Sequence, residues 1–232
     1  MKTLWLIPAR GGSKGIPDKN LKPFCGSSLV RRATLQALEC GDTDDIIFVS
    51  TDSHEIREEA EKCGVKIPFL RPADLASDTA STYSVILHVL QEFRERGEIF
   101  DRVVLLQPTS PFRTTQDIKE AVKIWTKDID MVVSVTESKA NPYFTLFEAD
   151  KDGFLHISKG DGKYIRRQDA PKTWEYNGAV YVMSVSSLLK GPISEFKKIL
   201  PYAMPGSRSI DLDTPEDWII AETIFKLRCN NQ

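Results

Sequence analysis

The stretch from Ala9 to Asn20 follows an apolar segment at the start of the chain and combines flexible backbone with positive charge. Its glycines and cations are Arg10, Gly11, Gly12, Lys14, Gly15 and Lys19. Glycines let a backbone approach a ligand closely, and the cations would meet negative charge. This chemistry is typical of a phosphate-binding loop. The spacing matches neither G-x-x-x-x-G-K-[ST] nor G-x-G-x-x-G, which argues against the usual ATPase and dinucleotide sites.

Two carboxylates, Asp211 and Asp213, stand two residues apart near the other end of the chain. In an extended segment, residues i and i+2 face the same way, and two close carboxylates repel unless a cation lies between them. Carboxylates together with substrate phosphates are the usual ligands of Mg²⁺. The pair therefore predicts a magnesium site. The simpler alternative is that Asp213 only caps the helix expected to begin at Pro215.

Two further polar clusters accompany these groups. Residues Arg71 to Ser81 run from an extended stretch into small polar residues, which would either line a ribose or base, or only cap the next helix. Residues Leu106 to Arg113 end an apolar stretch with two prolines that hold polar side chains rigidly. Such a rigid polar loop favours a binding site over a simple turn.

The elements that must position these groups alternate between strand and helix. Apolar, β-branched stretches predict strands at Thr3–Pro8, Asp45–Ser50, Arg102–Gln107 and Asp130–Val135. Helical periodicity lies between them, at Leu29–Cys40, Val85–Phe93 and Ile118–Trp125, and helix starts are expected near Ser53, Thr115 and Thr214. This order predicts an α/β fold with a mostly parallel sheet covered by helices on both faces. Ligands bind beyond the carboxyl ends of such strands, where the polar clusters occur.

The pattern changes between Glu137 and Glu175, where glycines interrupt short strands and aromatic residues lack a covering helix. A hairpin arm that buries its aromatics against a second subunit would explain this segment. The alternative is a loop folded onto its own domain. We expect one domain over residues 1–232, with the arm at 137–175 inserted in it.

Composition excludes several classes of protein. Lys and Arg total 31 against 33 Asp and Glu, so the surface is not built to neutralise a nucleic acid. Apolar runs are too short for a membrane helix and the start lacks a signal-peptide pattern, which predicts a cytoplasmic protein with no membrane partner. The four cysteines, Cys25, Cys40, Cys63 and Cys229, show no zinc-binding spacing. None of the three histidines lies in a motif.

Taken together, the clusters resemble the cytidylyltransferase family that activates sialic acids and related nine-carbon 2-keto sugar acids. The resemblance spans roughly Trp5 to Phe225 and is carried, in the family's order, by IPARGGSKGIPDKN, RPADLASDTAS, LLQPTSPFR, RRQDAP followed by YNGAVYV, and SIDLDTPEDW. It implies a Rossmann-like nucleotidyltransferase fold. It also implies transfer of CMP from CTP to the anomeric hydroxyl of the sugar acid, with release of pyrophosphate.

The resemblance implies roles for individual residues. Nucleotide-binding positions are Arg10, Gly11, Gly12, Ser13, Lys14, Lys19, Asn20, Arg71, Ala80 and Ser81. Arg10 and Lys19 would stabilise the transition state, because attack on the α-phosphate needs alignment and charge neutralisation. Asp211 and Asp213 match the family's metal carboxylates and would hold Mg²⁺, which would lower the pKa of the attacking hydroxyl and make a dedicated base unnecessary.

The acceptor carries a carboxylate, so a cation must meet it. Gln107, Arg166 and Arg167 are the candidates, the two arginines jointly, since neighbours in an extended chain point oppositely. The excursion resembles the family's dimerisation arm, so Lys139 or Tyr143 would complete a pocket across a homodimer.

The resemblance fixes the class of acid but not its identity. Sialic, legionaminic and pseudaminic acids differ at substituents far from the carboxylate. A synthetase for the eight-carbon acid Kdo is the nearest enzymatic alternative, and a non-catalytic CTP-binding module is the alternative from another class.

Overall fold

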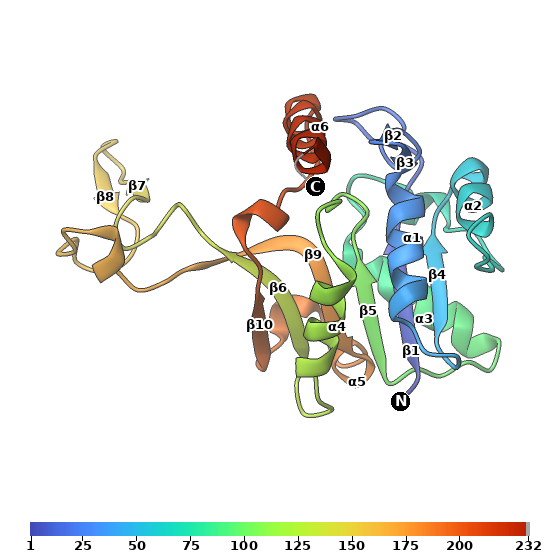
Figure 1. The fold of residues 1–232 in the computed structure, drawn as a ribbon. Coiled ribbons are helices and arrows are strands. Elements are labelled where there is room, and N and C mark those ends of the chain that lie inside the picture. The colour runs from blue at the N-terminus through green and yellow to red at the C-terminus, as the bar shows by residue number, and fades with distance from the viewer. Residues whose placement is uncertain (231–232) are drawn as a thin grey trace.

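The computed structural model describes residues 1–230, with side chains as far as Arg228, and is built on a six-stranded sheet (Figure 1). The strands, in their order across the sheet, are β10 (Ile199–Ala203), β6 (Met131–Glu137), β9 (Trp174–Ser184), β5 (Arg102–Leu106), β1 (Thr3–Pro8) and β4 (Ile46–Ser50). β1 pairs in parallel with β4 and β5, and β10 in parallel with β6. β9 runs antiparallel between β5 and β6. The prediction of a mostly parallel sheet is confirmed.

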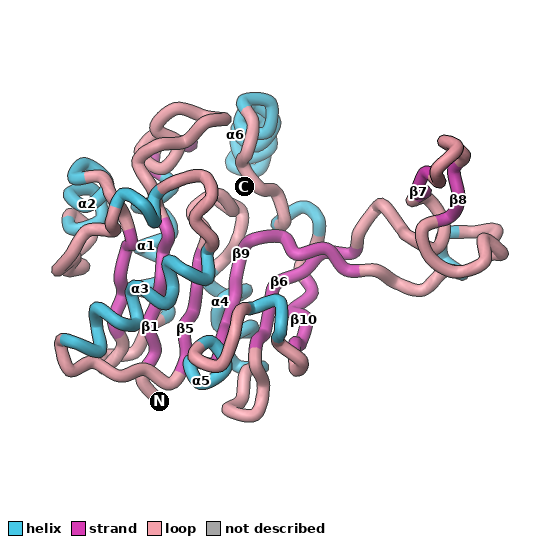
Figure 2. The backbone as a smooth tube through the Cα atoms, turned by 180° about the vertical axis from the view of Figure 1, so that it is seen from behind, coloured by secondary structure: helices cyan, strands magenta, loops and turns pink. Residues whose placement is uncertain are grey.

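Helices cover both faces of this sheet. The helices are α1 (Leu29–Cys40), α2 (His54–Glu61), α3 (Thr82–Glu95), α4 (Thr115–Ile124), α5 (Val185–Leu188) and α6 (Pro215–Asn230). Helices α1 and α4 lie on the face toward the viewer in Figure 1, and α3 and α5 on the face seen in Figure 2. Within residues 1–230, no helix is long and apolar enough to cross a membrane.

Hydroxyl side chains set the helix starts. Ser53 caps α2 by accepting from the backbone N–H of Ile56, and Thr114 forms a capping box with Asp117 at the start of α4. The starts expected near Ser53 and Thr115 are therefore confirmed. Short 3-10 helices, η1 (Ala73–Ala76), η2 (Arg167–Asp169), η3 (Ile193–Glu195) and η4 (Gly206–Arg208), occupy the connections.

A second apolar cluster fastens α6 to the loops above the sheet. Phe24 ends the short strand β2 (Pro23–Phe24), which pairs with β3 (Ser27–Ser28), and packs edge-on against Trp218 of α6, with ring centroids 5.4 Å apart. Phe112 and the fully buried Leu212 belong to the same cluster. Since Leu212 separates Asp211 from Asp213, this packing fixes the backbone that carries both carboxylates.

A bulge interrupts the pairing of β6 with β9. The register shifts between Val133 and Val135, and Ser134 accepts from the Val180 N–H at 2.7 Å. Asn177 accepts from the Ser134 hydroxyl at 2.6 Å, and Gly178 takes a φ of +73°, a conformation that favours glycine. The bulge turns Gly178 toward the carboxyl end of β5.

Between β6 and β9 the chain leaves the sheet and extends away from it (Figures 1 and 2). This arm holds the hairpin of β7 (Phe147–Ala149) and β8 (Leu155–Ile157). Its apolar side chains are open to solvent, with Phe154 68% exposed and Ile165 88% exposed. Large apolar surface of this kind indicates an interaction site.

Candidate active site

A polar pocket of about 360 Å³ lies beyond the carboxyl ends of β1 and β5. Its lining residues are Pro8, Arg10, Ser13, Lys14, Gly15, Lys19, Asn20, Arg71, Thr82, Gln107, Pro108, Thr109 and Asp213. A second pocket, of about 330 Å³ between α3 and α5, has a mostly apolar surface, and Arg94 is the single cation in its lining, against the four cations of the polar pocket. The polar pocket therefore holds the candidate site.

Backbone and side-chain contacts fix the glycine-rich loop over this pocket. The Gly11 N–H donates to Asp52 at 2.9 Å, and the buried Asn20 amide donates to the Arg10 carbonyl at 3.0 Å. A Cβ at Gly15 would lie 2.2 Å from the Asp213 carbonyl oxygen. Gly15 is therefore required because the loop and the carboxylate segment meet backbone to backbone.

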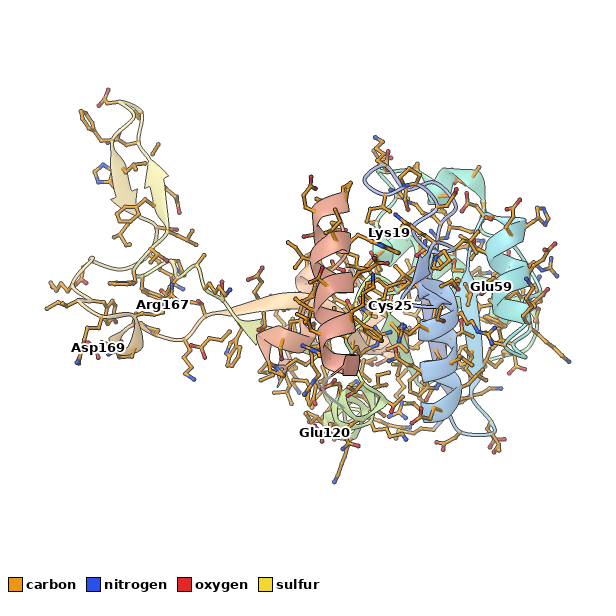
Figure 3. All side chains as sticks on the ribbon, turned by 45° about the horizontal axis from the view of Figure 1, so that its top comes forward. Lys19, Cys25, Glu59, Glu120, Arg167 and Asp169 are labelled. Carbon is orange, nitrogen blue, oxygen red and sulfur yellow. The ribbon has the colours of Figure 1, made fainter. Side chains whose placement is uncertain are left out.

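Each cation of the loop has a partner within the chain. Arg10 lies 2.7 Å from an oxygen of Asp78, and Lys14 lies 2.5 Å from the other oxygen of the same carboxylate. Lys19, labelled in Figure 3, donates to the Leu212 carbonyl at 2.6 Å and to Asp213 at 3.3 Å. The three charges thus face one pocket from two sides.

Arg71 supplies a fourth cation, from the wall of the pocket. Its guanidinium is buried and donates to the hydroxyl of Ser50 at 3.0 Å and to the carbonyl of Ser50 at 2.6 Å. Burial lowers the pKa of Arg71 to about 10, so the group remains charged at neutral pH. A fixed, buried cation suits recognition of an anionic or carbonyl-rich ligand.

The two aspartates differ in their surroundings. Asp211 is half-buried and accepts from the Thr109 hydroxyl and, at 3.1 Å, from the Leu212 N–H. Burial raises the pKa of Asp211, and the negative charge of Asp213 acts in the same direction. Asp213 is exposed, and Thr214 caps α6 in its place by accepting from the Asp217 N–H. Asp213 is thus not occupied as the helix cap that the alternative interpretation required.

The pair fits a hard cation that takes further ligands from a substrate. Two interacting carboxylates, one of them unfavourably buried, gain from a positive charge between them. Among the described residues, no group of three or more His, Cys, Asp or Glu side chains is arranged to hold a metal. Two protein carboxylates are enough for magnesium, because this ion usually binds through one or two carboxylates together with substrate phosphates and water.

Gln107 and Ser110 meet Asp211 around Gly178. A Cβ on Gly178 would lie 3.4 Å from the Gln107 amide oxygen and 3.7 Å from both the Ser110 hydroxyl and the Asp211 carboxylate. The Ser110 hydroxyl is buried without a hydrogen-bond partner. Arg113 holds this corner by donating to the Gln107 carbonyl at 3.0 Å and the Ala179 carbonyl at 2.6 Å. Gln107 therefore lines the polar pocket beside Asp211, and its role in binding the acceptor stays a prediction.

Other residues of the predicted nucleotide site lie outside the lining of the pocket. Gly11, Gly12, Ala80 and Ser81 do not line it. Ser81 caps α3 by accepting from the Ser84 N–H at 3.0 Å, which is the structural alternative stated for that cluster. Its neighbour Thr82 does face the pocket. The nucleotide-binding role of these four residues stays a prediction.

The remaining acceptor candidates lie on the arm, remote from Lys19 in the same chain (Figure 3). Arg166 pairs with Asp169 at 2.8 Å, and Arg167 donates to the Lys139 carbonyl at 2.7 Å. Tyr143 packs against Tyr164 at 6.3 Å between ring centroids. Within one chain, the arm carries Arg166 and Arg167 away from the sheet, and neither lines the polar pocket. Their role in binding the acceptor carboxylate stays a prediction.

Asp78 and Thr109 are polar residues that the sequence patterns do not single out. Both belong to motifs quoted above, yet neither has a spacing that marks it. No local pattern marked Asp78, because its ion pairs with Arg10 and Lys14 depend on which loops the fold brings together. For Thr109, position beside Gln107 at the end of a strand was the signal.

The fold is an α/β fold with a mostly parallel sheet. Its candidate site combines a cationic glycine-rich loop with a segment that carries two carboxylates and meets the loop backbone to backbone. These features together are typical of a nucleotidyltransferase. The family model described as "Cytidylyltransferase" matches residues 4–211, and the chain belongs to that family. The predicted family and Rossmann-like fold are confirmed.

Relatives and solved structures agree with this assignment. The CMP-N,N'-diacetyllegionaminic acid synthase of Legionella pneumophila is 32% identical over 98% of this chain and 97% of its own length. The N-acylneuraminate cytidylyltransferase of Streptococcus agalactiae is 35% identical over 94% of this chain, which spans only 52% of that protein.

Among solved structures, a CMP:2-keto-3-deoxy-manno-octonic acid synthetase complexed with CTP aligns with 98% of this chain and with 100% of its own chain, with a TM-score of 0.72. The 4-diphosphocytidyl-2C-methyl-D-erythritol synthase of Anaerococcus prevotii aligns with 97% of this chain and with 96% of its own chain, with a TM-score of 0.64. Both are 15% identical to this chain and establish the fold alone.

Proposed function

We propose that this protein transfers CMP from CTP to the anomeric hydroxyl of a nine-carbon 2-keto sugar acid and releases pyrophosphate. The observation that carries the proposal is the convergence of Arg10, Lys14, Lys19 and Asp213 around one pocket. Asp211 adjoins this pocket, since it interacts with the lining residues Thr109, Asp213 and Lys19. The names of the relatives, synthases of CMP-activated nonulosonic acids, support this class of acceptor.

The reaction needs alignment and charge neutralisation more than covalent catalysis. The acceptor oxygen attacks the α-phosphorus while the bond to the bridging oxygen of pyrophosphate breaks. Arg10 and Lys14 face the region where a triphosphate would lie, and Lys19 stands between that region and Asp213. These charges would stabilise the leaving pyrophosphate more than the bound nucleotide, which is what lowers a barrier.

Magnesium is the cofactor that the carboxylates would hold. Asp211 and Asp213 would be its protein ligands, and Thr109 orients Asp211 through its hydroxyl. When bound, the ion would neutralise charge between the triphosphate and the incoming hydroxyl and lower the pKa of that hydroxyl. The pocket lining contains no histidine, so proton removal falls to the acceptor's own acidity and to solvent.

The arm supports a homodimer in which each subunit completes the other's acceptor pocket. Within one chain, Gln107 lines the pocket, whereas the predicted acceptor contacts on the arm, Lys139, Tyr143, Arg166 and Arg167, do not. Figure 3 shows Arg167 on the arm, away from Lys19. Exposed apolar side chains on the arm, including Phe154 and Ile165, favour burial against a partner. The arginines would then meet the acceptor carboxylate across the dimer.

The test is pyrophosphate release with CTP and Mg²⁺ across a panel of acids: N-acetylneuraminic, diacetyllegionaminic, pseudaminic and Kdo. Release with a nine-carbon acid and CTP, and not with other nucleotides, is the expected result. Release with Kdo alone would favour the eight-carbon alternative. If no acid of the panel gives pyrophosphate release although CTP still binds, the result would contradict the proposal and favour a CTP-binding module.

A further inference from the structure

Asp78 binds the two cations that would otherwise be open to a phosphate. One carboxylate oxygen lies 2.7 Å from Arg10 and the other 2.5 Å from Lys14. Arg10 also approaches the Ala76 carbonyl of the same loop at 3.4 Å. A single protein anion thus engages two cations with its two oxygens, which is how a phosphate would engage them.

A triphosphate and Asp78 cannot both use these partners. Both are anionic, so a bound triphosphate would repel the carboxylate as well as claim the N–H groups of Arg10 and Lys14. The pKa of Asp78 is held below its ordinary value by hydrogen bonds from Lys14 and Arg10, so the carboxylate is charged at neutral pH. Binding of the nucleotide must therefore displace Asp78 from at least one cation.

The position of Asp78 allows such a displacement. It lies between η1 and the cap of α3, and its neighbours Ser77 and Thr79 are exposed, outside helix and strand. The carboxylate is 41% exposed. Moving it breaks two solvent-accessible ion pairs, each of which is weak.

We infer that Asp78 is an internal competitor for the phosphate site, one that occupies Arg10 and Lys14 in the free protein and yields to the triphosphate. It sets the affinity for CTP below what the cations alone would give. It also returns to them as pyrophosphate leaves, which speeds product release. This inference rests on the proposed function, since it assumes that the loop receives a triphosphate.

The experiment compares Asp78→Asn with Asp74→Asn, a matched control in the same loop. Asp74 carries the same charge and is exposed, and it forms no ion pair among the described residues. Calorimetry would measure binding of three probes: CTP, inorganic triphosphate and cytidine. For Asp78→Asn, we expect CTP and inorganic triphosphate to bind about three- to tenfold more tightly, because two exposed ion pairs no longer compete.

Further measurements test whether the charge of Asp78 causes the effect. Cytidine should bind Asp78→Asn as it binds the wild type, and Asp74→Asn should behave as the wild type with every probe. Asp78→Glu keeps the charge and should stay close to the wild type. The gain for Asp78→Asn should shrink as NaCl rises, because salt screens exposed charges. Pyrophosphate should inhibit Asp78→Asn at correspondingly lower concentration.

Two results separate this inference from the proposed function. Unchanged or weaker CTP binding by Asp78→Asn, with wild-type circular dichroism, would overturn the inference, because Asp78 would then position the cations and not compete for them. Asp78→Ala checks the same point if the Asn variant unfolds. Failure of the wild-type protein to bind either CTP or inorganic triphosphate would overturn the proposed function, and the inference with it.

Discussion

At the scale of single residues, Gly178 combines an unusual backbone conformation with a position beside Gln107 and Asp211. Its φ of +73° disfavours any side chain, and a Cβ there would come into van der Waals contact with Gln107, Ser110 and Asp211. Gly97 has a similar φ of +82°, but a Cβ there would meet nothing within 4 Å. The two positions share the conformational strain and differ in what surrounds them.

Changing either glycine to alanine should therefore cost similar stability, about 1–2 kcal/mol in the free energy of unfolding. Only Gly178→Ala should also lower turnover and raise KM for the acceptor, because a backbone shift that relieves the strain at this position would move the contacts of Gln107 and Asp211. Urea unfolding and steady-state kinetics on both variants test this. Equal activity of the two variants would show that the corner around Gly178 does not serve the reaction.

At the scale of elements, Asp130 holds three segments together at the edge of the sheet. Its carboxylate accepts from the Ser187 hydroxyl at 2.6 Å and from the N–H groups of Lys197 and Lys198 at 2.9 and 2.8 Å. The contacts join the start of β6 to α5 and to the approach to β10. The hydrogen bond from Ser187 and those from the two backbone N–H groups lower the pKa of Asp130.

Asp130→Asn should destabilise the protein by about 1 kcal/mol at neutral pH, a modest value because the group is partly solvated. A lowered pKa means that the stabilisation is present above the ordinary Asp pKa of 3.8 and is lost as pH falls below it. The difference between wild type and variant should therefore narrow in acid. Urea unfolding at a series of pH values measures it, and a difference independent of pH would contradict the assignment.

The sequence predicted most elements because local patterns specify them. Apolar runs marked β1, β4, β5 and β6, and helical spacing marked α1, α3 and α4. The strand β9 was not predicted, because Asn177 and Gly178 interrupt its apolar run. The bulge opposite Ser134 explains how these two residues fit in a central strand. The partners of Arg10 and Lys14 also escaped, since an ion pair depends on which loop the fold brings opposite, and no local pattern contains that.

At the scale of the whole molecule, the arm predicts that activity belongs to a dimer and not to a single chain. Lys19→Ala should disable its own pocket while leaving its arm intact, and Arg167→Ala should do the reverse. Mixing the two inactive proteins should restore about a quarter of wild-type activity, because half of the dimers are mixed and each has one complete site. Light scattering should find dimers throughout.

Two controls accompany this mixing experiment. Phe154→Asp on the arm should give monomers, whereas Ile99→Asp, an exposed apolar residue of the main body, should not. No recovery of activity in verified mixed dimers would show that the arm arginines do not act on the partner's pocket.

The meeting of the glycine-rich loop with the carboxylate segment has a consequence for how the protein is made. Lys19 and Leu212 share a hydrogen bond across 193 positions, and Gly15 touches Asp213. A nascent chain can pair its early strands while the ribosome is still adding residues, but the pocket is incomplete until the segment around Asp213 emerges. Once both segments are present, bound CTP would contact residues that lie far apart along the chain and stabilise the folded protein by mass action.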